Sequence, residues 1–161
     1  MNRRHTTRLI TYFFLTLAVM LGIFIFSAQD GGDSQAVSDG LLGRIKELIE
    51  LLPPLTDDGA GKDVRKYAHM FEYALLGITS ALLFAELFYR RTQPVACSAV
   101  ISYIFCFIYA LSDEWHQYFV PGRSAEFSDA LVDSIGFTAG IMLTAAICLI
   151  VEHNKRRAIN E

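Results

Sequence analysis

Four long apolar runs dominate this chain and limit what it can fold into. They cover residues 9–28, 74–89, 95–111 and 134–151, and Glu86 is the one charged residue within them. About twenty helical residues cross the hydrocarbon core of a bilayer. A helix of a soluble protein would carry polar residues every three or four positions, and these runs do not. The pattern therefore predicts an all-α fold, a polytopic membrane bundle of four transmembrane helices.

The first run follows Arg3, Arg4 and Arg8, as the apolar part of a secretory signal would. It is too long for a signal peptide, and its end at Phe26-Ser27-Ala28 fits a cleavage site poorly. We therefore expect the first helix to be retained, in a single domain over residues 1–161. The expected helices are residues 9–28, 66–89, 94–118 and 129–151.

Basic residues divide unevenly between the connections. Residues 29–66 hold eight acids against five lysines and arginines, and Arg123 is the only lysine or arginine between Asp113 and Asp129. The other side collects Arg3, Arg4, Arg8, Arg90, Arg91, Lys155, Arg156 and Arg157. Since cytoplasmic loops are enriched in lysine and arginine, we expect a multi-pass membrane protein with both termini in the cytoplasm.

The connection after the first run contains a second helical pattern. Leu41, Ile45, Leu48 and Leu52 recur at helical spacing, and Pro53-Pro54 follows them. This predicts an outer amphipathic helix over residues 38–52, lying on the membrane surface or over the mouth of the bundle. A lid and a plain packing helix both remain open.

Carboxylates from three expected helices share one depth. Glu72, Asp113 and Asp133 each lie roughly 27–30 Å along a helix from the cytoplasmic markers Arg90, Gln93 and His153. That distance places all three at the outer boundary of the hydrocarbon. Ionisable groups there are expensive unless they are paired, so the cluster is a hypothesis of function.

Helical spacing adds neighbours to these acids. His69 shares a face with Glu72 and Tyr73, and Lys66 lies one turn earlier; Asp113, His116 and Gln117 repeat the same spacing. Asp129 and Asp133 continue into Gly136 and Gly140, a stripe that allows another helix to approach closely. The candidate catalytic residues are His69, Glu72, Glu114, His116 and Asp133. The candidate ligand-binding residues are Lys66, Tyr73, Asp113, Gln117, Arg123 and Asp129.

Plainer roles exist for several of these residues. Tyr73, Trp115, Tyr118 and Phe119 fit an aromatic belt at the membrane interface. Asp129 could simply favour the start of the fourth helix. The His69/Glu72 and Asp113/His116 pairs resemble metal-binding pairs of some helix bundles, but no third or fourth ligand stands out, so no metal site is predicted.

The same residues carry a resemblance to a known family. Its elements are Phe26-Ser27-Ala28-Gln29, Lys66, His69, Glu72-Tyr73, Asp113-Glu114-Trp115-His116-Gln117, Gly122-Arg123, Asp129, Asp133 and Gly136. Together they resemble the VanZ-like family of bacterial membrane proteins, over nearly the whole chain. The family is named for a protein linked to teicoplanin resistance. The resemblance implies a small membrane protein of the cell envelope and fixes no reaction.

Two function classes remain open. An enzyme at the outer leaflet would use a histidine or carboxylate as general base on a lipid-linked or cell-wall substrate, with Arg123 or Lys66 holding an anionic group. A binding module would recognise a lipid, precursor or antibiotic without turnover. A channel or carrier has less support, because the acids gather only at the outer rim. The expected partners are the lipid bilayer and a lipid-linked or cell-wall ligand, with no nucleic acid. The sequence fixes neither a cofactor nor the oligomeric state.

Overall fold

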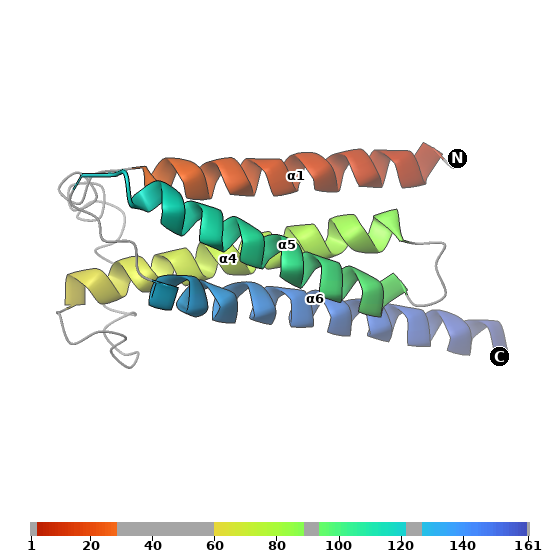
Figure 1. Cartoon of the computed structure of the whole chain (residues 1–161). Coiled ribbons are helices and arrows are strands. Elements are labelled where there is room, and N and C mark those ends of the chain that lie inside the picture. Colours follow the sequence, from red (N-terminus) through yellow and green to blue (C-terminus); the bar gives the residue numbers. More distant parts are fainter. Residues whose placement is uncertain (1–2, 29–59, 89–93, 122–126, 161) are drawn as a thin grey trace.

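The fold is all-α, as predicted (Figure 1). The computed structural model describes residues 3–28, 60–88, 94–121 and 127–160. They form α1 (Arg3–Ser27), α4 (Ala60–Leu87), α5 (Pro94–Gln117) and α6 (Phe127–Asn160). All four helices are long and apolar enough to cross a membrane, which confirms the expected spans. The helix expected over residues 38–52 lies outside the described residues.

Three helices run further than the apolar runs alone indicated. α1 begins at Arg3, α4 begins at Ala60, and α6 continues to Asn160. The polar residues in these extensions are compatible with helical structure. Continuing each helix also keeps the backbone N–H and C=O groups of the added residues hydrogen-bonded within that helix. α5 begins at Pro94, where proline is well tolerated because the first helical N–H has no partner within the helix.

The bundle has two distinct ends (Figure 1). One end carries both termini, the end of α4 and the start of α5; we call it the terminal end. The other end, which we call the site end, is where α1 and α5 finish and α4 and α6 start. α4 and α6 share the most extensive contact, and α1 packs mainly against α4.

Glycines set the distance between α4 and α6. A Cβ atom on Gly136 would overlap the backbone carbonyl oxygen of Met70, and one on Gly140 would overlap that of Ala74. Gly77 of α4 meets the backbone of Phe137 in the same way. The small-residue stripe anticipated on the fourth helix therefore does lie against another helix, and the two backbones come into direct contact.

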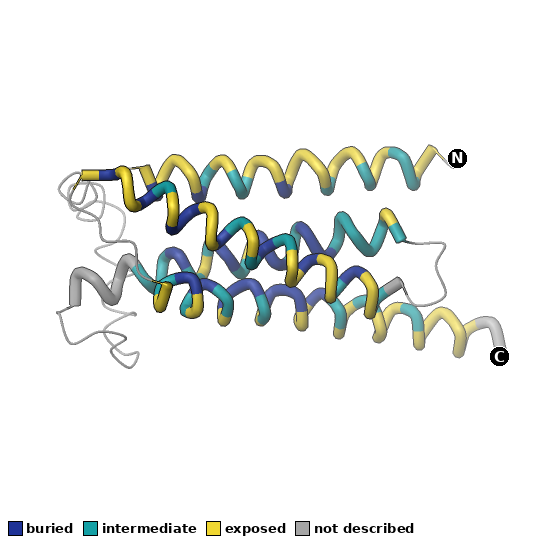
Figure 2. Tube along the Cα trace, viewed as in Figure 1, coloured by how far each residue is buried: buried dark blue, intermediate teal, exposed yellow. Residues whose placement is uncertain are grey.

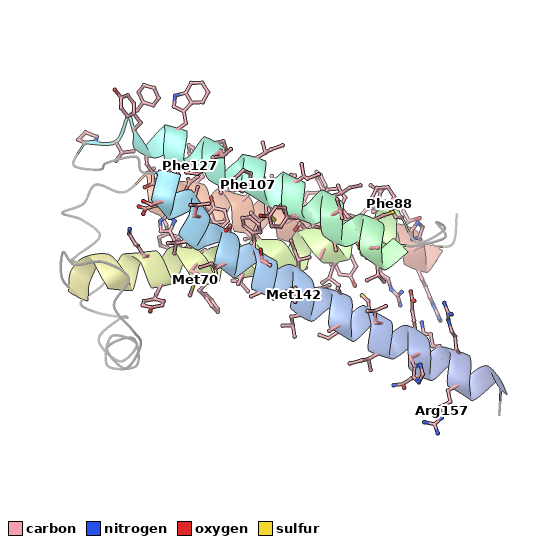
Figure 3. The ribbon with its side chains drawn as sticks, turned by 60° about the horizontal axis from the view of Figure 1, so that its bottom comes forward. Met70, Phe88, Phe107, Phe127, Met142 and Arg157 are labelled. Atoms are coloured by element: carbon pink, nitrogen blue, oxygen red, sulfur yellow. The ribbon has the colours of Figure 1, made fainter. Side chains whose placement is uncertain are left out.

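Burial is confined to the lines where helices meet (Figure 2). Large apolar side chains cover the outside of the bundle, as expected for a protein surrounded by lipid. Trp115, Tyr118 and Phe119, near the site end, are each about 70 % exposed, in keeping with an interfacial belt. Tyr73 is fully buried and cannot belong to that belt. Basic side chains, Arg157 among them, lie along the last turns of α6 at the terminal end (Figure 3).

Candidate functional site

A small polar cavity lies at the site end between α4, α5 and α6. It offers about 20 Å³ to the centre of a water molecule, which is room for about one water. Its walls are formed by Lys66, His69, Glu114, Gln117, Asp129, Val132 and Asp133. Six of these seven residues were among the candidates from the sequence. Residues far apart in the chain thus line one space.

Asp113 stands beside this cavity at the centre of a buried hydrogen-bond network. The Ser27 hydroxyl donates to Asp113 Oδ2 at 2.7 Å, and the Gln117 amide donates to the same oxygen at 3.0 Å. The Gln117 amide also lies 3.0 Å from Ser27 Oγ, so the three side chains form a closed ring. This ring ties the last turn of α1 to the last turns of α5, and it fixes the direction in which the carboxylate points.

His69 approaches the same carboxylate from α4. Its Nδ1 lies 4.0 Å from Asp113 Oδ2, which is an electrostatic contact and too long for a hydrogen bond. The ring is 9 % exposed and forms part of the cavity wall. Asp113 can therefore stabilise positive charge on His69 while His69 faces the cavity.

Lys66 and Asp129 form an ion pair across the cavity, from α4 to α6. Lys66 Nζ lies 2.6 Å from Asp129 Oδ1, and both side chains are partly exposed. Asp129 is therefore more than a favourable charge at the start of its helix. The Lys66 ammonium group, which the sequence suggested as a binding group for an anion, is therefore already paired with Asp129.

Glu114 and Asp133 bring two more carboxylates to the cavity. Glu114 is 7 % exposed and Asp133 is 3 % exposed. Asp133 lies within electrostatic range of Glu114, Asp113, Asp129 and Glu72. The candidate site therefore concentrates acidic side chains at the edge of an apolar bundle.

Besides Asp113, three described candidates from the sequence do not line the cavity. The ring of His116 stacks on Phe24 of α1 at a centroid distance of 4.4 Å. Tyr73 packs between Tyr109 and Phe137 in the core. Glu72 lies close enough to Asp133 to interact with its charge, but it is not part of the wall. Arg123 lies outside the described residues.

Ser27 was not among the candidate site residues, although it is one of the residues that carry the family resemblance. It is completely buried and holds Asp113, although it closes a long apolar run. Its position in the sequence could have identified it, because a serine at the end of the first span lies at the same level as the acids of the other helices. Val132 was also missed, since nothing in the sequence distinguishes an apolar wall residue from one that faces lipid.

The order of the polar groups limits the chemistry they can perform. In a serine hydrolase the histidine stands between the serine and the acid. Here Asp113 stands between Ser27 and His69, so Ser27 donates to a carboxylate and not to a histidine. His69, supported by Asp113, is the group placed to accept a proton. Among the residues the structure describes, no three His, Cys, Asp or Glu side chains are grouped as metal ligands.

Comparison with the curated proteins and with the solved structures gives no match. A sequence model of one protein family does match, over residues 12–150. This stretch includes most of α1 and every residue of the cavity wall. With four membrane-spanning helices and this polar site at one end, the chain belongs to the VanZ/LLP1 family.

Proposed function

We propose that this protein binds a lipid-linked or cell-wall component in the cavity at the site end, and that this end faces the outside of the cell. The observation that carries the proposal is the convergence of His69, Glu114 and Asp133 from three helices on one small space. Burying charged groups at a membrane boundary is costly, so their assembly around a cavity supports a role in recognition. Binding requires only the hydrogen bonds and electrostatic contacts that these three side chains can form.

The orientation rests on the distribution of lysine and arginine. The terminal end carries the basic residues in the first turns of α1 and the last turns of α6, including Arg3, Arg4 and Arg157. Positive charge favours the cytoplasmic side. The cavity would then open at the outer leaflet, where cell-wall precursors and lipid headgroups are available.

Catalysis by His69 is a second candidate, favoured by its contact with Asp113. A general base needs a proton acceptor at the ligand and a group that stabilises the charge it acquires. His69 lines the cavity, and Asp113 Oδ2 lies 4.0 Å from its Nδ1. Glu114, on the same wall, would be the complementary acid or hydrogen-bonding group.

Conduction has less support from the interior of the bundle. Below the site, the buried hydroxyl groups of Thr16, Ser80, Ser98 and Thr144 donate to carbonyl groups of their own helices. Side chains satisfied in this way give less support to a path that passes an ion or a proton. At the terminal end Glu86 pairs with His5 at 2.7 Å.

The test compares a deletion strain complemented with the wild type, Glu114→Gln, His69→Gln or Glu152→Gln. Glu152 lies on α6 near the terminal end, so its substitution is the matched control for loss of one carboxylate. Lipids and cell-wall precursors are profiled in each strain, and teicoplanin susceptibility is measured because of the family's namesake. We expect one envelope species to change in the deletion strain and in Glu114→Gln, and to stay normal in Glu152→Gln.

The two candidate functions separate on His69→Gln. A general base predicts loss of function with ligand binding retained, because glutamine keeps the polar wall and removes proton acceptance. A binding module predicts that function falls only as far as binding does. Full complementation by both Glu114→Gln and His69→Gln would contradict a role for the cavity.

A further inference from the structure

An apolar groove lies between α5 and α6, separate from the polar cavity. It offers about 320 Å³ on the measure that gives the polar cavity about 20 Å³. Its walls come from α5, between Ala99 and Ile104, and from α6, between Thr138 and Met142, and they are almost entirely apolar. Val100, Ile104 and Met142 are each more than half exposed. The groove therefore opens to the surroundings of the bundle.

The groove lies at the depth of lipid acyl chains. At the helical rise of 1.5 Å per residue, Ala99 and Ile104 are about 8 and 15 Å along α5 from Pro94. Met142 is about 14 Å along α6 from Asp133. A hydrocarbon core of roughly 30 Å gives each leaflet about 15 Å of acyl chain. A chain from the terminal end is therefore long enough to reach the groove.

The α6 wall of the groove continues along one helix face to a basic residue at the terminal end. Arg156 follows Met142 by 14 residues and Thr138 by 18, which are close to four and five turns of 3.6 residues. Leu149 lies on this face between them and is exposed. The last turns of α6 extend past the start of α5 (Figures 1 and 3). One face of α6 thus joins an apolar wall to a cation.

Positive charge dominates the end of α6 at the level of the lipid headgroups. Arg156 is about 35 Å along the helix from Asp133, which is beyond a hydrocarbon core of roughly 30 Å. Lys155 and Arg157 flank Arg156, and all three are exposed. After Asp133, Glu152 is the only acid in α6, so three basic residues face one carboxylate. This surface complements an anionic headgroup.

We propose that the groove binds an acyl chain of an anionic phospholipid and that Arg156 binds the phosphate of the same lipid. The two parts of this surface match the two parts of such a molecule, an apolar chain and a negatively charged headgroup. A dissolved phosphate would use only the basic part. The inference is independent of the proposed function, because the groove and the polar cavity share no lining residue.

The headgroup arm of the test uses full-length protein in nanodiscs that hold equal amounts of phosphatidylglycerol and phosphatidylcholine with identical acyl chains. Native mass spectrometry measures which lipids stay bound after the nanodisc is removed. We expect phosphatidylglycerol to be retained preferentially. Arg156→Gln should lower the ratio of retained phosphatidylglycerol to phosphatidylcholine about fivefold, since one basic group is lost. Arg3→Gln is the matched control, because Arg3 is equally an exposed arginine of the terminal end but lies on α1, and its ratio should match the wild type.

The groove arm fills the apolar space. Val100 lines the groove and is 60 % exposed, so Val100→Trp can extend into the groove without displacing the core. Retained phosphatidylglycerol should fall at least about fivefold, because the chain loses its apolar contacts. Ile108→Trp is the matched control, since Ile108 is 62 % exposed on the same helix and does not line the groove. Helix content and thermal unfolding check each variant, and Met142→Trp fills the groove from the other wall if Val100→Trp does not fold.

Four results would overturn the lipid assignment. Three are equal retention of the two lipids by the wild type, a wild-type ratio in Arg156→Gln, and wild-type retention in both Val100→Trp and Met142→Trp. The fourth is a dimer in the native spectra that Val100→Trp converts to a monomer, which would assign the groove to a second copy of the chain. None of these results bears on the polar cavity, whose function is tested separately by Glu114→Gln and His69→Gln.

Discussion

Ser27 and Asp113 illustrate how single side chains sustain a polar site in an apolar bundle. Asp113 Oδ2 accepts hydrogen bonds from Ser27 and Gln117, and all three side chains are buried. Each bond satisfies a group that would otherwise be stripped of water with no replacement. The ring also places Asp113 beside His69, so the same bonds serve stability and the candidate site.

Replacing Ser27 with alanine removes the shortest bond in this ring. Because Asp113 stays buried and loses a donor, the free energy of unfolding should fall by about 1–3 kcal/mol. Ser112→Ala is the control, since the Ser112 hydroxyl is exposed and donates only to the Tyr109 carbonyl of its own helix. Its effect should stay within about 0.5 kcal/mol. Thermal or denaturant unfolding in mild detergent measures both, and equal stability of the two variants would contradict the role given to Ser27.

At the scale of elements, the pairing of α4 with α6 holds the site together. Lys66 and His69 come from α4, while Asp129 and Asp133 come from α6. Gly136 and Gly140 let the two backbones touch one turn and two turns below the acids. The spacing of the two helices below the site therefore controls the distance between its opposing charges.

Gly140→Ala should separate these helices. The added Cβ would meet the backbone carbonyl oxygen of Ala74, which cannot move without shifting α4. We expect a loss of about 1–3 kcal/mol in the free energy of unfolding and weaker function of the cavity. Gly22→Ala in α1 is the matched control, because its Cβ would meet nothing within 4 Å, and its stability should be unchanged or up to about 1 kcal/mol higher. Thermal unfolding of the two variants side by side measures the difference, and tolerance of Gly140→Ala would show that α4 and α6 can separate at little cost.

At the scale of the whole molecule, the bundle is polarised. One end holds the acidic cavity, and the other holds both termini and the basic residues in the last turns of α6 (Figures 1 and 3). In a bilayer such asymmetry selects one orientation during insertion. It also decides whether the cavity meets the outside or the cytoplasm.

Labelling of introduced cysteines tests the orientation. Cys97, Cys106 and Cys148 are free thiols and are first replaced with serine or alanine. Ser124→Cys then marks the connection between α5 and α6, and Arg157→Cys marks the terminal end. A membrane-impermeant maleimide added to intact cells should label position 124 and spare position 157. The reverse pattern would place the cavity in the cytoplasm.

Much of the architecture could be predicted from the sequence. Length and hydropathy predicted the four spans, because the thickness of a bilayer sets the number of helical residues needed to cross it. Counting residues from the cytoplasmic end of each span also indicated that acids of different helices share one level. The stripe of Gly136 and Gly140 indicated which face of α6 lies against another helix.

Neighbouring residues of α5 show where this reasoning stopped. His116 and Gln117 are adjacent, yet His116 stacks on Phe24 while Gln117 lines the cavity and holds Asp113. Successive residues of a helix point about 100° apart. Sequence spacing shows which side chains share a face, but it does not show which neighbour that face meets.

Chain length, hydropathy and helical rise were enough to predict the membrane class, the four spans and a common level for the acids along their helices. Which of those residues face one another depends on how the helices pack. The rotation of each helix about its axis follows from packing, above all from the contact of α4 with α6. As a result, Ser27 contacts Asp113 beside the cavity, and Glu114 and Asp133 line the cavity together. His116 and Tyr73 face other helices instead.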